Sequence, residues 1–458
     1  MYTTMVLATD ISRAFYAVDS ARSPAGVREH LHTLIIDALA CILGGSDTEI
    51  ARIAAQAAGT KAPGPGRATI LPRGPAATPA DAALVNGTML RSLDFMDVYV
   101  DVDVSHPSEA VPAALACAEA FGASGIDFLD SVLGAFTLHA HLASTIGLHR
   151  NGLHHVGHAA WTVPLLAARL AGHDAVAAAN VLNLSAGGLI VPEGFSRGQL
   201  ANVKAMAYPL LAKRAVELTD LAKAGLAAQP GACEEVIGLL SRVVGRDLDP
   251  AVFVPPADPS RILAISLKAY PAQYALQPLI AATSAFHHAQ PRRVEAIRRI
   301  IVRAARQTVE RTADRAKFRP ASREAADHSL PFCLASGLLD GGLTAEGLRR
   351  GRWKDADVLR IMDAIEVEVA GEDDALAVGR QEIVLIFTDG TSLSLDCTYP
   401  AEGVTWRQIA LDKLATFSAG SSNAGRIAAA VENLEQADSV APLVAALRDV
   451  STPRARAL

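Results

Sequence analysis

Apolar residues recur at intervals of three and four through the first half of the chain, with glycine near the end of several of these runs. This spacing places apolar side chains on one face of a helix, and glycine commonly follows the last helical turn. The pattern does not repeat as a fixed structural unit, so an array of short helical repeats has no support. Helices are therefore predicted over residues 27–45, 81–94, 109–122, 127–147, 158–171, 175–188 and 203–228.

The pattern changes after Arg261, where Val, Ile and Leu gather in short runs. Two of these runs flank Asp389-Gly390, a strong signal for a two-residue hairpin turn. Helical spacing returns over residues 405–417 and 423–447. Between Arg261 and this tail, strands are predicted over 297–303, 364–370, 382–388 and 392–399, and helices over 274–288, 323–339 and 355–363.

These patterns predict a mainly α protein with two domains. A chain of 458 residues exceeds the usual size of a single core. Residues 1–261 and 401–458 are assigned to a large all-α domain, which is discontinuous, and residues 262–400 to a smaller α+β domain. Half of the residues are hydrophobic and only 5% are aromatic, and the abundance of alanine agrees with closely packed helices.

Charge and cysteine usage narrow the partners and the compartment. A formal net charge of -6 gives no basic field of the kind that nucleic-acid binding needs. The five cysteines are scattered without a CxxC motif, so reduced thiols are expected. Asp10 and Arg13 argue against a secretory signal and favour the cytoplasm. Residues 131–149 lack a formal charge, but their histidines favour a buried helix over a membrane span.

Candidate chemistry first appears just after Asn86. Arg91, Asp94 and Asp97 follow one another at helical spacing, and His106 lies close behind. Arg91 and Asp94 are three residues apart and would share a helix face. Two interpretations stay open at this point: a functional loop, or an exposed ion pair beside a solvated acidic loop.

A second cluster is the histidine-rich segment GLHRNGLHHVGH. His154 and His158 are four residues apart and could share one cation on a helix. No carboxylate or cysteine ligand stands beside them, and glycines interrupt the helical pattern. Histidines that cap a helix or fill a core are therefore favoured over a metal site, with a catalytic imidazole as the intermediate alternative, and no metal is predicted.

Lysine is rare in this chain, and two of the eight lysines stand in apolar segments. Lys204 and Lys268 must each reach water with the end of the side chain or meet an anion. Reaching water is the general expectation, but a pocket that binds carboxylates would explain both lysines and Arg91. The motifs GxGxxG, GxxxxGK[ST] and GxSxG are absent, so nucleotide-binding and serine-hydrolase classes lose their main support.

The chain resembles the MmgE/PrpD family in the order and spacing of five segments. These are NGTMLRSLDFMD with SHPS, NGLHHVGH, NVKAMAYPLLAKRAVELTDLAKAGL, LKAYP and AADHSLPFCLASGLLDG. The likeness runs from about residue 27 to residue 417. It implies a large all-α domain with a smaller α+β lid domain, a homodimer, and activity without a metal or an organic cofactor.

The resemblance also implies the site residues. Carried over by motif, the catalytic candidates are His106, His154, Asp94, Lys204 and Lys268, and the substrate-binding candidates are Arg91, Asp97 and Tyr270. Family members include 2-methylcitrate dehydratases, cis-aconitate decarboxylases and an iminodisuccinate epimerase. Arg91 and the segment ADHSLP resemble the dehydratase branch, whereas Met96 departs from the residues common in the family.

A hydro-lyase is therefore expected, one that removes water from a small 2-hydroxy polycarboxylate such as 2-methylcitrate. His106 and His154 would form the acid and base pair in an order that the sequence leaves open, with Asp94 as their partner. Lys204, Lys268 and Arg91 would hold carboxylates. The alternatives are a decarboxylase or an epimerase on the same scaffold, or a helical protein without catalytic activity.

Overall fold

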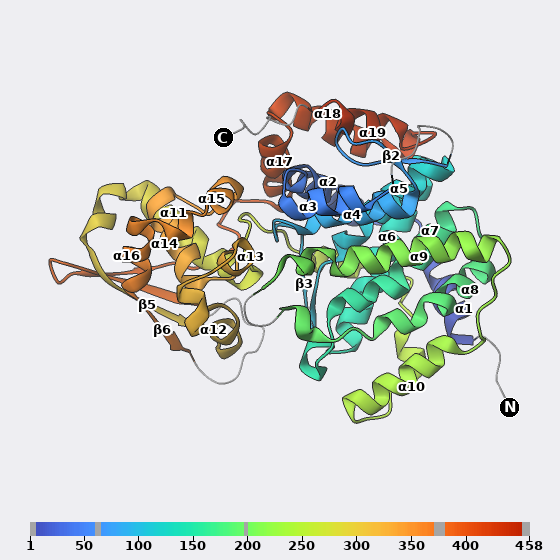
Figure 1. The fold of residues 1–458 in the computed structure, drawn as a ribbon, viewed down its shortest axis with the longest axis horizontal. Helices are drawn as coiled ribbons and strands as arrows, with labels where there is room; N and C mark the ends of the chain where they lie inside the picture. The colour runs from blue at the N-terminus through green and yellow to red at the C-terminus, as the bar shows by residue number, and fades with distance from the viewer. Residues whose placement is uncertain (1–5, 60–65, 197–199, 371–380, 451–458) are drawn as a thin grey trace.

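The computed structural model describes residues 6–59, 66–196, 200–370 and 381–450. Two lobes lie side by side (Figure 1). We call residues 6–267 and 406–450 the helical lobe and residues 272–395 the mixed lobe. Buried apolar side chains form two separate clusters, one in each lobe. The predicted fold class, mainly α with a smaller α+β part, is confirmed, whereas the domain boundaries at 261/262 and 400/401 stay a prediction.

Among the described residues, the first part of the helical lobe comprises ten α-helices, and the C-terminal helices complete the lobe. Of the last three helices, α17 and α18 pack against α2, and α19 packs against α18 (Figure 1). The bounds are α1 Val6–Tyr16, α2 Ala25–Gly45, α3 Glu49–Ala57, α4 Pro79–Arg91, α5 Val111–Phe121, α6 Gly125–Thr145, α7 Ala159–Leu170, α8 Ala175–Ser185, α9 Ala207–Lys223, α10 Ala232–Val244, α17 Trp406–Phe417, α18 Ser421–Glu432 and α19 Ala441–Arg448.

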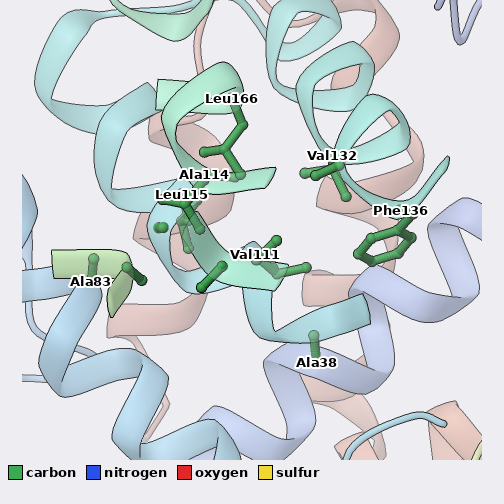
Figure 2. Close-up of a cluster of buried hydrophobic side chains, with 14 of the residues drawn as sticks. Ala38, Ala83, Val111, Ala114, Leu115, Val132, Phe136 and Leu166 are labelled. Carbon is green, nitrogen blue, oxygen red and sulfur yellow. The ribbon is translucent and has the colours of Figure 1, made fainter. Parts of the chain in front are cut away.

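Helix α5 lies in the middle of this lobe and is apolar almost all round, as expected of a helix covered on every side. Figure 2 shows part of the cluster around it, with labelled side chains from α2, α4, α5, α6 and α7. The labelled members are Ala38, Ala83, Val111, Ala114, Leu115, Val132, Phe136 and Leu166. Alanine and valine fill much of this space, so the helix axes approach closely and fix one another in position.

Glycine permits the closest of these approaches. A Cβ atom on Gly45, the last residue of α2, would lie 1.9 Å from the backbone oxygen of Met89 in α4. Because no side chain fits there, α2 and α4 touch through their backbones. This contact fixes the end of α4, which carries Arg91.

The mixed lobe is built on a four-stranded sheet in the order β6-β5-β7-β8. Strands β5 and β6 are parallel, and the other two pairs are antiparallel. The predicted hairpin is confirmed, but its turn is longer than the two residues predicted, because the backbone N–H of Phe387 donates to the backbone oxygen of Thr391 across residues 388–390. Gly390 adopts a φ of 84°, and the carboxylate of Asp389 accepts a hydrogen bond from the backbone N–H of Thr391. The bounds are β5 Ile297–Ala304, β6 Ile365–Val369, β7 Glu382–Phe387 and β8 Ser392–Leu395.

Helices cover this sheet, and α11 packs against α14. Their bounds are α11 Gln277–Ala289, α12 Arg306–Thr312, α13 Arg323–Ala326, α14 Leu330–Asp340, α15 Ala345–Arg350 and α16 Ala356–Asp363. The prediction of one helix over 323–339 is wrong in one respect: the segment forms two helices, α13 and α14, with a break between Ala326 and Leu330. Ser329 caps the start of α14 with its hydroxyl, and Pro331 occupies the first turn, so a new helix begins there.

Further corrections concern helix ends. The helix predicted over 81–94 ends at Arg91, the one over 203–228 begins with a 3-10 turn (Asn202–Met206), and the one over 423–447 is two helices. Two short strand pairs complete the helical lobe: β1 Ala68–Thr69 with β2 Ala76–Ala77, and β3 Tyr99–Val100 with β4 Val104–Ser105. Within the described ranges, no helix has the length and apolar character that a membrane crossing requires.

Candidate active site

A cavity of about 500 Å³ opens between the two lobes. The helical lobe supplies one wall, from the end of α4 and the histidine-rich segment, and the mixed lobe supplies the other, from residues 273 to 328. The predicted site residues that line it are Arg91, Asp94, His106, His154, Lys204 and Lys268. Residues distant in sequence are thus brought to one place, as the resemblance implied.

A larger cleft of about 1770 Å³ also lies between the lobes. Tyr270, Phe95 and Lys413 are part of its wall, and its described lining includes no histidine. The smaller cavity gathers imidazoles, lysines and carboxylates instead. We therefore take the smaller cavity as the candidate active site.

Asp94 lies at the centre of the site in an unusual backbone conformation. Its φ is 49°, in the left-handed region that residues other than glycine adopt at a cost. Its carboxylate lies 3.3 Å from Nζ of Lys204 and 3.2 Å from Nζ of Lys268. The prediction that Asp94 extends the helix of Arg91 is wrong, because the chain turns sharply after α4 and points the carboxylate at these lysines.

The two lysines set the charge of Asp94. Burial alone would raise its pKa, but Lys204 and Lys268 hold the pKa well below its ordinary value. Burial lowers the pKa of Lys268, and Asp94 opposes that effect. One carboxylate therefore stands between two ammonium groups, so Asp94 alone only partly balances the charge of these two lysines.

His106 is held by the loop that carries Asp94. Its Nδ1 lies 2.6 Å from the backbone oxygen of Asp97. A carbonyl oxygen only accepts, so Nδ1 carries the proton, and Nε2 of the neutral ring keeps its lone pair. Burial, together with the charges of Lys268 and Arg91, places the pKa of His106 well below its ordinary value. His106 is therefore a neutral imidazole with Nε2 able to accept a proton.

His154 has the opposite arrangement. The backbone N–H of Val156 donates to its Nδ1 at 3.2 Å, so Nδ1 holds the lone pair and Nε2 carries the proton. Burial and the charge of Arg91 keep the pKa of His154 well below its ordinary value. The rings of His106 and His154 both contact the ring of His155, with centroid distances of 5.1 and 4.4 Å. One cavity thus holds a proton acceptor and a proton donor.

Three histidines of this segment also form the metal-competent group of the described residues. One nitrogen each from His149, His154 and His155 lies within 4.8 Å of the others. His149 contacts the carboxylate of Asp103 through Nδ1, a usual arrangement for a metal ligand. His154 fits less well, because a metal on Nε2 would require loss of the proton that its bond to Val156 places there.

His154 and His158, which the sequence spacing would allow to share a cation, do not come together. His158 is buried, and its ring packs edge-on against His139 at 4.8 Å instead of joining the other three histidines. The reason is local: residues His155–His158 form a 3-10 turn before α7 begins. The expectation of a protein that works without a metal stays a prediction.

Arg91 lines the cavity but has partners of its own. Its guanidinium forms an ion pair with Glu109, and both side chains are almost fully buried. Its Nε donates to the backbone oxygen of Lys204 at 3.3 Å. Burial lowers the pKa of Arg91 to about 10, so the group remains charged at neutral pH. Arg91 therefore ties Lys204 to α4, and its predicted role as a carboxylate anchor stays a prediction.

Asp97 and Tyr270 do not line this cavity. Asp97 is fully buried behind His106, where its carboxylate accepts hydrogen bonds from the backbone N–H and the hydroxyl of Ser108. Tyr270 lies in the wall of the larger cleft. The structure does not bring these two together with the other candidates, and their predicted role in substrate binding stays untested.

His328 is a site residue that sequence reasoning missed. Its Nε2 lies 3.0 Å from Nζ of Lys204, and its Nδ1 contacts the carboxylate of Asp327. Burial, together with Lys204, lowers the pKa of His328. The helix predicted over 323–339 would include His328, yet Ser329 as a cap and Pro331 in the first turn of α14 are local signals that the residues before them form a loop.

Two family models match the chain. The MmgE/PrpD N-terminal domain matches residues 9–250, and the MmgE/PrpD C-terminal domain matches residues 270–436. The chain belongs to the MmgE/PrpD family. Membership supports an enzyme that catalyses a hydro-lyase or related reaction, and it leaves the substrate open. The gap between the two matched regions of this MmgE/PrpD protein falls where one apolar cluster ends and the other begins.

Proposed function

We propose that this MmgE/PrpD protein is a hydro-lyase that removes water from a small 2-hydroxy polycarboxylate, such as 2-methylcitrate, without a metal ion. The observation that carries the proposal is the complementary protonation of His106 and His154. The hydrogen bond from Val156 leaves a proton on Nε2 of His154, and the bond to Asp97 leaves a lone pair on Nε2 of His106. Dehydration needs one group of each kind.

In this mechanism His106 removes a proton from the carbon next to a substrate carboxylate. The electron pair of the broken C–H bond forms the new double bond, and the C–O bond to the hydroxyl group breaks. Nε2 of His154 gives its proton to the departing oxygen, so the products are an alkene and water. His106 then carries one proton more than at the start and His154 one fewer, so the starting state returns when His106 releases a proton and His154 gains one, directly or through solvent.

Positive charge supports this step where negative charge grows. As the C–H bond breaks, charge spreads onto the adjacent carboxylate, and cations placed beforehand stabilise it. Lys204 and Lys268 share the single carboxylate of Asp94, so their charge is only partly matched. A substrate carboxylate at the inner end of the cavity would complete the balance. A neutral substrate would not.

The first experiment is an ultraviolet absorbance screen of the purified protein with 2-methylcitrate, citrate and related hydroxy acids, since an alkene conjugated to a carboxylate absorbs there. We expect absorbance to rise, with an equal rate after treatment with a chelator. Proton NMR of the mixture in deuterated water identifies the product.

Other outcomes would overturn the proposal in distinct ways. Loss of carbon dioxide from cis-aconitate would identify a decarboxylase, and proton exchange with neither water nor carbon dioxide lost would identify an epimerase. A rate abolished by the chelator and restored by Zn²⁺ would instead favour a metal at the three histidines. No turnover of any acid would favour a protein without catalytic activity.

A further inference from the structure

Another buried lysine contacts the turn that carries Asp94. Lys413, in α17 of the C-terminal segment, donates from Nζ to the backbone oxygen of Phe95 at 2.7 Å. The same nitrogen lies 2.5 Å from Oδ1 of Asp37 in α2 and 4.1 Å from the ring centre of Phe95. Lys413 is 4% exposed and Asp37 is fully buried. The proposed mechanism uses neither of them.

Three backbone carbonyl groups of the turn after α4 accept hydrogen bonds from side chains. Lys268 donates to the backbone oxygen of Asp94 at 2.7 Å, Lys413 to that of Phe95 at the same distance, and His106 to that of Asp97. A left-handed conformation at a residue other than glycine persists only when its surroundings over-determine it. These three donors supply that constraint, and they come from separate parts of the chain.

We propose that Lys413, with Asp37 as its counterion, is a positioning residue that holds the turn at Asp94 in its left-handed conformation and so aims the Asp94 carboxylate at Lys204 and Lys268. Lys413 acts through the carbonyl of Phe95 and does not touch the substrate. The C-terminal helices thereby contribute to a site whose walls lie elsewhere. The role of the turn in turnover rests on the proposed function.

The test compares kinetics and stability in a set of variants. Lys413→Met keeps the length of the side chain but removes its charge and its donor. Because it leaves Asp37 buried without a partner, the double variant Asp37→Asn/Lys413→Met, which removes both charges, is made beside it. Arg169→Met is the matched control, because Arg169 pairs with Asp130 at 2.6 Å in the same lobe, away from the cavity.

We expect kcat of the double variant to fall roughly tenfold to a hundredfold, because small displacements of catalytic groups cost rates of that order. KM should change little, since the cations of the cavity remain. Lys413→Arg should recover part of kcat, because it restores a charged donor. Arg169→Met should lower the thermal midpoint and leave kcat unchanged. A double variant with the kcat of the parent protein would overturn the proposal, as would an equal loss of kcat in the control.

A crystal structure of the double variant separates this proposal from the proposed function. The positioning role predicts that Asp94 leaves the left-handed region and that its carboxylate moves away from Lys268. An inactive parent protein together with this displacement would contradict the proposed function alone. An unchanged φ at Asp94 would contradict the positioning role whatever the protein catalyses.

Discussion

At the scale of residues, two carboxylates three positions apart behave in opposite ways. Asp94 meets two lysines, which hold its pKa well below the ordinary value against the effect of burial. Asp97 is equally buried but meets the donors of Ser108, so burial dominates and raises its pKa to about 7. The resemblance placed both in the site, and their side-chain identity alone could not distinguish them. The two aspartates differ in the groups that their carboxylates contact, and the turn after α4 determines those contacts.

The raised pKa of Asp97 gives a prediction for stability against pH. In the unfolded chain an aspartate titrates near pH 4, so between about pH 4 and pH 7 the folded protein binds one proton more. The contribution of Asp97 to stability is complete below that range, falls by about 1.4 kcal/mol per pH unit within it, and is constant above it. Asp97→Asn removes this titration and retains an acceptor for Ser108.

We expect the free energy of unfolding of Asp97→Asn, relative to the parent protein, to rise by about 2–3 kcal/mol between pH 5 and pH 8. Urea denaturation at both pH values measures the difference, and the comparison cancels every other titrating group. If the two proteins showed parallel pH dependence, the carboxylate of Asp97 would already be ionised at pH 5 in the folded state.

At the scale of elements, apolar spacing predicted the helices well and their ends less well. The helix predicted to reach Asp94 stops at Arg91, because Lys268, 174 residues further along the chain, binds the backbone oxygen of Asp94. No local pattern contains that information. The break before α14 is different, because Ser329 as a cap and Pro331 in the first turn are local signals that predict a helix start. Apolar spacing in the sequence therefore predicts where the regular helices lie. The end of α4 at the site depends on contacts with residues distant in the sequence.

Two glycines of α2 form a matched pair for testing how α2 and α4 are held together. A Cβ on Gly45 would overlap the backbone of Met89, whereas a Cβ on Gly26 would meet nothing within 4 Å. We expect Gly45→Ala to destabilise the protein by about 1–3 kcal/mol or more, because a backbone must move. Gly26→Ala should be neutral or stabilise by about 0.5 kcal/mol. Thermal and chemical denaturation measure both, and equal effects would show that α2 and α4 do not depend on this contact.

At the scale of the whole molecule, the candidate site belongs to neither lobe alone. His106 and His154 come from the helical lobe, and His328 and Gln273 come from the mixed lobe. Periodicity predicts that each lobe forms, but the way in which the lobes face each other depends on surfaces that no short pattern describes. The ordered motifs of the family resemblance are what predicted that distant segments meet. His328 belongs to one of those motifs, AADHSLPFCLASGLLDG, but nothing in the motif itself marks it as facing the cavity.

The assembly is the prediction that belongs to this scale. We propose a homodimer, as the family resemblance implies. Light scattering coupled to size-exclusion chromatography should give a mass of twice 47.8 kDa, independent of concentration over the micromolar range. A mass of 47.8 kDa at every concentration would contradict the proposal.

The central claim is that His106 removes the carbon-bound proton and His154 protonates the departing hydroxyl. Exchange of the substrate C–H for deuterium, followed by NMR beside dehydration in His106→Ala and His154→Ala, tests it most directly. We expect dehydration to fall about 10²- to 10⁴-fold in both variants, while exchange persists in His154→Ala and is lost in His106→Ala. Exchange at the parent rate in His106→Ala would show that His106 is not the base.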